Sequence, residues 1–210
     1  MNQREYWDSV SEKKTFTTPF QSEEFSMFVV KTDFIVDVGC GYGRTLNELY
    51  ENGYINLLGI DFSEEMINRG RKEFPHLKFA VKHDDTIELD DDSVDAIILF
   101  AVLTCIVSDA EQKKLIQEIR RVLKPGGILY VNDFLLNSDN RNLERYAKYE
   151  KRLGVYGTFE LMEGATVRHH TEDWIKELLC DFTELKYAHL TFTTMNGNKS
   201  NGFYFIGRSR

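Results

Sequence analysis

Residues 35–44 read IVDVGCGYGR, and the architecture of the whole chain can be argued outward from them. A short apolar run with one acid in it ends in three glycines on alternate positions, Gly39, Gly41 and Gly43, and a helical pattern follows. A strand that leads through a glycine turn into a helix is the start of a βα unit. Glycine is required where the backbone turns tightly and a ligand approaches without a Cβ in between. The stretch therefore predicts a ligand site at the end of a strand.

The spacing of the glycines distinguishes two kinds of nucleotide site. Dinucleotide-binding turns read G-x-G-x-x-G, and the third glycine lets the helix pack closely. Counted from Gly39 and Gly41, that third position is Arg44 here, and the pattern is G-x-G-x-G. This pattern resembles motif I of the class I S-adenosylmethionine-dependent methyltransferases. The resemblance implies that S-adenosylmethionine, and its product S-adenosylhomocysteine, contact Asp37, Gly39, Cys40 and Gly41.

Strand and helix patterns alternate from residue 34 onward. Residues 35–38 (IVDV) and 96–100 (AIILF) are nearly continuous apolar runs, which is typical of parallel strands buried on both faces. The β-α-β-α order predicts a parallel sheet with helices on both faces. Residues 196–198 (NGN) indicate a tight turn near the end of the chain, and two strands joined by such a turn are antiparallel.

The family resemblance implies the same α/β fold in more detail. It is a Rossmann-like, doubly wound sheet of seven strands in the order 3-2-1-4-5-7-6, with strand seven antiparallel. A dehydrogenase-type domain would instead continue with a parallel sixth strand. The antiparallel hairpin predicted at the C-terminal end therefore favours the methyltransferase type independently of the glycine turn.

Composition limits the class of protein. The 210 residues fit a single domain spanning 1–210, and 42% hydrophobic with 29% charged residues is typical of soluble globular proteins. The sequence has no apolar stretch of 18 residues, and its polar N-terminus lacks the apolar core of a signal peptide. Three scattered cysteines argue against a disulfide framework, so we expect a cytoplasmic protein. No C-x-x-C or H-E-x-x-H spacing occurs, so we expect no metal.

The net charge of −8 bears on the partners of the chain. Proteins that bind nucleic acids usually carry a basic face, because they neutralise phosphates. We therefore expect a small-molecule methyl acceptor, no nucleic acid and no membrane. The oligomeric state cannot be read from the sequence, which shows no coiled-coil repeat.

Acidic residues follow the predicted strands at the edge where ligands of open α/β sheets bind. Asp61 lies 22 residues after Gly39, next to Phe62, at the end of the second strand. An acid at this point can accept hydrogen bonds from a ribose diol. The alternative is that Asp61 caps the helix that follows. The resemblance implies the ribose role for Asp61 and adds Phe62 to the cofactor contacts.

Two further segments match the family pattern. After the third strand, the resemblance implies an acid that faces the adenine amino group, and this acid is Asp84 or, as the second choice, Asp85. Phe100 begins the segment whose backbone carbonyls meet the amino group of the methionine moiety in the family. Residues 121–127 (RVLKPGG) match the family's turn before strand five, with glycine where a type II turn requires positive φ.

Two segments outside the shared core are expected on the substrate side. Residues 1–32 form an N-terminal lid or helical segment, and the polar, aromatic insert 136–170 shapes the acceptor pocket. Three residues are weak candidates for a catalytic base or acceptor contact, and the catalytic residues are otherwise unknown: Asp133, His169 and His170. Cys105 invites comparison with cytosine-C5 methyltransferases, but the proline that precedes their cysteine is missing, so a packing role is favoured.

Four functions are compatible with these patterns. The leading hypothesis is an S-adenosylmethionine-dependent methyltransferase that acts by in-line displacement on an oxygen or nitrogen nucleophile of a small molecule. The alternatives are an RNA or protein methyltransferase of the same fold and a non-catalytic cofactor-binding domain. An NAD-dependent oxidoreductase is the least favoured, because Arg44 replaces the third glycine.

Overall fold

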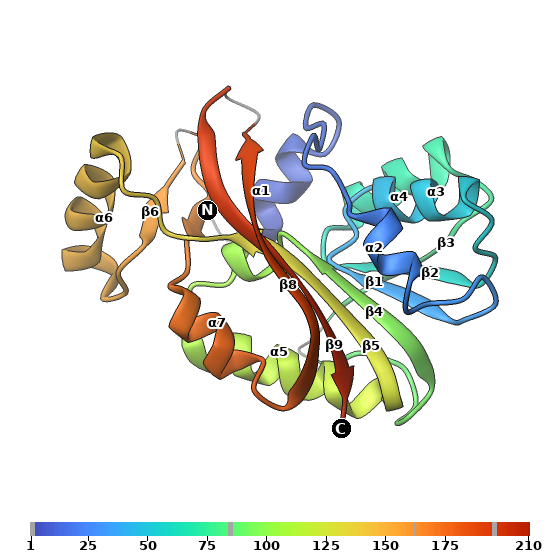
Figure 1. Cartoon of the computed structure of the whole chain (residues 1–210). Coiled ribbons are helices and arrows are strands. Elements are labelled where there is room, and N and C mark those ends of the chain that lie inside the picture. Colours follow the sequence, from blue (N-terminus) through green and yellow to red (C-terminus); the bar gives the residue numbers. More distant parts are fainter. Residues whose placement is uncertain (1–2, 84–85, 162, 195–196) are drawn as a thin grey trace.

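The computed structural model describes residues 3–83, 86–161, 163–194 and 197–210. Nine strands are assigned in this part of the chain: β1 (Ile35–Val38), β2 (Leu57–Asp61), β3 (Lys78–Val81), β4 (Val94–Phe100), β5 (Leu123–Phe134), β6 (Thr158–Glu160), β7 (Thr166–Arg168), β8 (Phe182–Thr193) and β9 (Lys199–Ser209). Seven of them form one sheet in the order β3-β2-β1-β4-β5-β9-β8, while β6 and β7 pair with each other (Figure 1). Strands β1 to β5 are parallel, and β9 runs antiparallel to both β5 and β8. With the insert strands β6 and β7 set aside, the predicted order 3-2-1-4-5-7-6 is confirmed.

Seven α-helices accompany the strands in the described ranges: α1 (Gln3–Val10), α2 (Ser22–Ser26), α3 (Arg44–Glu51), α4 (Glu64–Glu73), α5 (Asp109–Val122), α6 (Asn140–Leu153) and α7 (Glu172–Leu178). Short polar side chains start several of them. Ser63 Oγ accepts the Met66 N–H at the start of α4, and Ser108 Oγ accepts the Glu111 N–H at the start of α5. Such caps satisfy amides that have no partner within the helix.

The two faces of the sheet carry separate apolar cores, because successive side chains of a strand point to opposite faces. Val36 packs on the face that α5 and α7 cover, in one cluster with Ile116 and Ile175. Its neighbour Ile35 packs on the face that α3 and α4 cover, in a second cluster with Leu46. Burial on both faces explains why the strand reads as a continuous apolar run.

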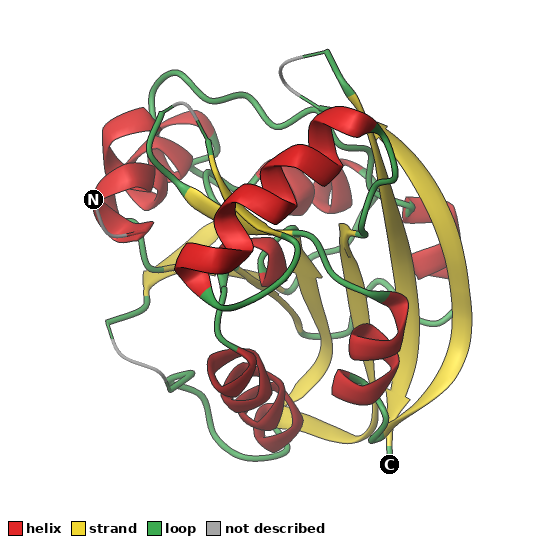
Figure 2. Cartoon of the chain, turned by 90° about the vertical axis from the view of Figure 1, so that its left-hand side faces the viewer, coloured by secondary structure: helices red, strands yellow, loops and turns green. Residues whose placement is uncertain are grey.

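The structure differs from the sequence-based expectations at two places. The turn predicted at 124–127 lies inside β5, which starts at Leu123, although Gly126 has the positive φ of +80° expected there. The insert 136–170 is not a plain loop, since it contains α6 and the β6–β7 hairpin. In the view turned by 90°, α6 crosses in front of the sheet (Figure 2).

Candidate functional site

The turn after β1 takes a backbone conformation that favours glycine. Gly39, Gly41 and Gly43 have φ values of +78°, +55° and +87°, in a region that residues with a Cβ rarely adopt. A Cβ on Gly39 would lie 2.4 Å from Val102 Cγ2, and one on Gly41 would lie 2.5 Å from Phe16 Cε2. Both neighbours line a cavity above the turn, so side chains here would collide with the cavity wall.

Replacing Gly39 by alanine is expected to destabilise the protein and to abolish cofactor binding. Positive φ costs an alanine about 1–2 kcal/mol, and the collision with Val102 adds about 1–3 kcal/mol. Gly53→Ala is the matched control, because Gly53 has φ +87° but nothing within 4 Å of its Cβ position. Urea unfolding of both variants measures the difference. Equal losses of unfolding free energy would show that the collision with Val102 is relieved at no cost.

Asp61, at the end of β2, is 7% exposed and lines the same cavity. Its Oδ2 accepts the Gly41 N–H and its Oδ1 accepts the Ser63 N–H, each at 2.8 Å. The N-cap of α4 is Ser63, so Asp61 is not the capping residue. Burial raises the pKa of Asp61 to about 6, although the amide hydrogen bonds lower it. Because a carboxylate has about four lone-pair sites, Asp61 keeps acceptor capacity for a ligand.

Asp37, in β1, carries the clearest unsatisfied group of the cavity wall. It is 1% exposed, and its Oδ1 has no hydrogen-bond partner among the described residues. Burial, and after it the nearby Asp61 charge, raise the pKa of Asp37 to about 7, although the Arg44 guanidinium lowers it. A buried carboxylate oxygen without a donor is unfavourable. The site therefore fits a ligand that brings a donor, such as the α-ammonium group of S-adenosylmethionine.

The other residues predicted at the cofactor lie around the same cavity where the structure describes them. Cys40, Phe62 and Phe100 line it. Burial raises the pKa of the Cys40 thiol well above its ordinary value, so the thiol stays protonated. Asp84 and Asp85, predicted to face the adenine ring, lie outside the described residues.

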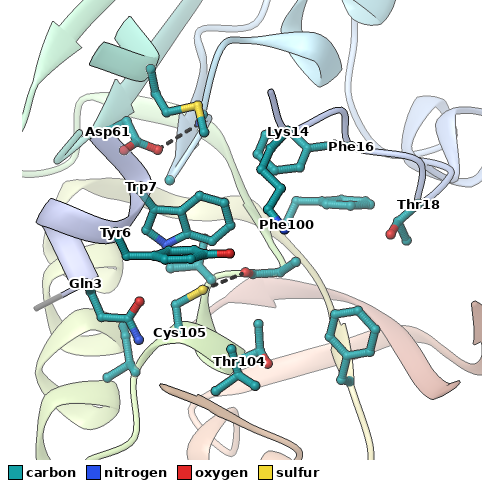
Figure 3. Close-up of a pocket in the computed structure, with 18 of the residues that line it drawn as sticks. Gln3, Tyr6, Trp7, Lys14, Phe16, Thr18, Asp61, Phe100, Thr104 and Cys105 are labelled. Atoms are coloured by element: carbon teal, nitrogen blue, oxygen red, sulfur yellow. Dashed lines mark hydrogen bonds between the residues drawn. The ribbon is translucent and has the colours of Figure 1, made fainter. Parts of the chain in front are cut away.

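The cavity has a volume of about 910 Å³, within the range of about 300–1,000 Å³ that small-molecule sites occupy. Tyr6 and Trp7 of α1 and Phe16 after it line the cavity (Figure 3). Their rings contact one another, with centroids 5.1 Å apart for the first pair and 6.0 Å for the second. Aromatic rings at these spacings exclude water from the space below them. The N-terminal segment therefore forms an apolar wall of the cavity.

Hydrogen bonds tie this N-terminal segment to the sheet domain. Asp8 Oδ1 accepts the Ser63 hydroxyl at 2.6 Å, next to the start of α4. The Arg44 guanidinium donates to the Thr18 carbonyl at 2.7 Å. The sequence predicts a lid or helical segment at 1–32 but not these contacts, because each contact joins residues more than 25 positions apart.

His169 is the predicted base candidate that lines the cavity, at 6% exposure. Its Nδ1 lies 2.6 Å from the Tyr146 hydroxyl and 3.1 Å from Asn137 Nδ2. Its ring stacks on Phe134 at 5.5 Å and meets the Phe159 ring edge-on at 4.9 Å. Burial lowers the pKa of His169 well below its ordinary value, so the imidazole is neutral.

The structure does not bring the other two candidates, His170 and Asp133, to the described cavity wall. His170 Nε2 lies 2.9 Å from Gln112 Nε2, and burial lowers the pKa of His170 to about 3. Asp133 is fully buried, and its two oxygens accept the Thr104 N–H at 3.1 Å and the Phe134 N–H at 2.7 Å. Burial raises the pKa of Asp133 to about 7. The contacts of Asp133 join the end of β5 to the segment that follows β4.

Cys105 lines the cavity beside the N-terminal wall (Figure 3). Its Sγ lies 3.7 Å from the Ala101 carbonyl oxygen. Burial raises the pKa of Cys105 to about 12, so the group is a thiol and a poor nucleophile at neutral pH. The packing role favoured from the sequence fits this environment.

Two absences concern only the described ranges of the chain. There, no group of three or more His, Cys, Asp or Glu side chains is placed to hold a metal ion. In the same ranges, no helix has the length and apolar character needed to cross a bilayer.

The parallel sheet that ends in an antiparallel pair, with a glycine turn below a cavity, defines a nucleotide-binding domain of the class I methyltransferase type. A family model described as "Methyltransferase domain" matches residues 35–127. A solved structure of an S-adenosylmethionine-dependent methyltransferase from Methanosarcina mazei superposes with a TM-score of 0.85 at 26% identity, over 92% of this chain and 99% of that one. Residues 35–127 thus match the methyltransferase-domain family, and the whole chain has the fold of the class I S-adenosylmethionine-dependent methyltransferases.

Curated relatives match mainly over the cofactor-binding half. The ubiquinone/menaquinone biosynthesis C-methyltransferase UbiE of Campylobacter jejuni is 30% identical over 116 residues, which are 52% of this chain and 48% of that protein. The tRNA N(3)-cytidine methyltransferase METTL2 of Mus musculus is 32% identical over 111 residues, 48% of this chain and 28% of that protein. The chain thus spans half or less of the length of these two relatives, and their acceptors differ.

Proposed function

We propose that the chain transfers a methyl group from S-adenosylmethionine to an oxygen or nitrogen atom of a small molecule. The buried Oδ1 of Asp37, unpartnered among the described residues, carries the proposal. It requires a hydrogen-bond donor from the cavity. The α-ammonium group of S-adenosylmethionine would supply this donor, and its ribose hydroxyls would use the remaining acceptor capacity of Asp61.

The residues of the chain act by binding and alignment. When bound, S-adenosylmethionine supplies an electrophilic methyl group on a sulfonium ion. Asp37 and Asp61 create a negative potential that suits a cationic ligand. The aromatic wall of Tyr6, Trp7 and Phe16 excludes water and restricts the acceptor. Alignment of acceptor and donor is the main contribution that a displacement of this kind requires.

The environment of the ionisable groups supports an oxygen or nitrogen nucleophile. An oxygen or nitrogen atom attacks through its lone pair and its proton can then leave to solvent, whereas a carbon nucleophile needs a base to remove its proton. Three groups at or near the described cavity are poor bases for such a proton: the amide-bound Asp133, the Cys105 thiol with its raised pKa, and His169, whose Nδ1 faces two donors. An acceptor with its own lone pair needs none of them.

The walls around the cavity favour a small-molecule acceptor over a nucleic acid. The cavity is bounded by residues of α1 and by the insert that holds α6, β6 and β7. A net charge of −8 disfavours binding to a polyanion. UbiE and METTL2 show that relatives in this family differ in acceptor, so the acceptor has to be tested directly.

Calorimetric titration with S-adenosylmethionine, S-adenosylhomocysteine and NAD in parallel tests the donor. We expect binding of the first two only, and preference for NAD would overturn the proposal. Formation of S-adenosylhomocysteine with a small-molecule panel, and separately with total tRNA, tests the acceptor. Turnover with tRNA alone would assign the RNA alternative, and cofactor binding without turnover on either would assign a non-catalytic domain.

A further inference from the structure

The insert contributes a cationic wall to the cavity, in contrast to the acids at the glycine turn. Arg141 and Arg145 of α6 line the cavity together with Phe159 of β6 and His169. The residues that would hold S-adenosylmethionine lie in β1, β2 and the turn between β1 and α3. The insert therefore faces the space left for the acceptor, an argument that rests on the proposed function.

Arg145 is held in place without a carboxylate at ion-pair distance among the described residues. Its guanidinium carbon lies 3.4 Å from the centroid of the Phe159 ring, a cation–π contact. Its Nε is buried and has no hydrogen-bond partner in the described part of the chain. Burial lowers the pKa of Arg145, and the nearby Tyr146 raises it. A cation kept in a low-dielectric wall without an anion is unfavourable unless a ligand completes it.

Three other cations of the cavity wall have polar partners of their own. Lys14 pairs with Glu163 at 3.2 Å. Arg44 donates to the Thr18 carbonyl at 2.7 Å. Arg141 lies 3.8 Å from the Asp139 carboxylate. Arg145 contacts the Phe159 ring and the Tyr146 side chain but no carboxylate at ion-pair distance among the described residues, so it is placed to bind an anionic group of the acceptor.

The hydrogen bonds around His169 assign its tautomer. Asn137 Oδ1 accepts the Asn201 N–H at 2.8 Å, so its Nδ2 faces His169 Nδ1 as a donor. The Tyr146 hydroxyl accepts the Asn137 N–H at 3.3 Å, and its own proton points to Nδ1 at 2.6 Å. Nδ1 is therefore an acceptor, and the proton of the neutral ring is on Nε2. His169 is a donor toward any ligand that Nε2 meets.

We infer that the methyl acceptor carries a carboxylate group, which Arg145 binds and the Nε2–H of His169 supports. A guanidinium matches a planar carboxylate through two parallel hydrogen bonds. One guanidinium and one neutral donor suit a monoanion. The rings of Phe134 and Phe159 provide the apolar surface for the rest of the acceptor.

Calorimetric titration of the protein saturated with S-adenosylhomocysteine tests this inference. Acetate, benzoate and phenylacetate are each compared with the corresponding neutral amide, and inorganic phosphate is a separate arm. We expect at least one acid to bind about tenfold or more tightly than its amide, as charged hydrogen bonds to a buried cation imply. Arg145→Gln should remove this preference, while Lys148→Gln, which removes an exposed charge from the same helix, should retain it.

Two results would overturn the inference: no acid binds better than its amide, or the preference survives in Arg145→Gln. Phosphate binding that is tighter than that of every acid and is lost in Arg145→Gln would replace the carboxylate by a phosphate. Titration of S-adenosylhomocysteine into Arg145→Gln separates this test from the proposed function. Its affinity should stay within about twofold of wild type, because Arg145 lies outside the residues assigned to the cofactor; a larger loss would contradict the assignment of Arg145 to the acceptor side.

Discussion

Asp61→Ala is expected to weaken the binding of S-adenosylhomocysteine by about 5- to 150-fold, or about 1–3 kcal/mol. The substitution removes a buried carboxylate that would accept ribose hydroxyls. It also leaves the Gly41 and Ser63 amides without the acceptor they have now, at 2.8 Å each. Both effects weaken cofactor binding, because Gly41 belongs to the glycine turn. Isothermal titration of the folded variant measures the loss.

Ser63→Ala is the matched control for this prediction. It removes the hydroxyl that caps α4, at an expected cost of about 0.5–2 kcal/mol of unfolding free energy. It also removes the hydroxyl that donates to Asp8, while the Asp61 carboxylate and its amide contacts remain. The loss of cofactor affinity should therefore be smaller in Ser63→Ala than in Asp61→Ala. If Asp61→Ala binds S-adenosylhomocysteine as wild type does and remains folded, Asp61 only organises the turn.

The cofactor half of the site could be predicted from the sequence because its parts are local. Asp37 and the three glycines lie within seven residues, and the type of turn follows from glycine spacing alone. Asp61 could be placed as well, because the carboxyl ends of neighbouring parallel strands meet at one edge of a sheet. The strand order was implied by the family resemblance, and the C-terminal hairpin predicted from the sequence agreed with it.

The acceptor half could not be predicted in the same way. Arg145, Phe159 and His169 come from a helix, a short strand and a loop that meet only in the folded insert. No spacing rule links them, and each residue read alone is most simply a surface or core residue. Predicting the contact of Arg145 with the Phe159 ring would have required knowledge of how α6 packs on β6.

Asp133 illustrates the limit of strand-end reasoning. It follows the rule for a functional acid, since it lies near the carboxyl end of β5, and an acceptor contact was expected there. Its side chain instead accepts the amide of Thr104, after β4, and that of Phe134, at the end of β5, and is fully buried. A strand end fixes where a residue lies but not which way the side chain turns, because neighbouring backbone amides compete for the carboxylate.

The affinity for S-adenosylhomocysteine is expected to rise with pH from about 5.5 to about 8 and then to level off. Burial raises the pKa of Asp37 to about 7 and that of Asp61 to about 6 in the ligand-free protein. The ammonium group of the ligand favours the ionised carboxylates, so binding releases protons below these pKa values. At pH 6, one unit below the pKa of Asp37 and at that of Asp61, the affinity should be about 10-fold lower than on the plateau from Asp37 alone and about 20-fold lower with both.

The same pKa values predict an opposite trend for the stability of the ligand-free protein. Both pKa values lie above the ordinary aspartate value of 3.8, so protonation of the two carboxyl groups stabilises the folded state. This stabilisation is present below about pH 4 and is lost as the pH rises through 6 to 7. The increase in melting temperature caused by S-adenosylhomocysteine should therefore grow between pH 5.5 and 7.5. Thermal melts with and without the ligand measure it.

Asp37→Asn separates the titration of Asp37 from that of other buried acids. An amide at this position cannot ionise, so the variant should bind more weakly at pH 7.5 and lose most of the pH dependence between 5.5 and 7. Asp133→Asn is the matched control, because burial also raises the pKa of Asp133 to about 7 but its oxygens face backbone amides. Calorimetry in two buffers of different ionisation enthalpy counts the protons released on binding. If proton release persists in Asp37→Asn and disappears in Asp133→Asn, the titrating group is Asp133. The assignment of the ammonium contact to Asp37 would then be wrong.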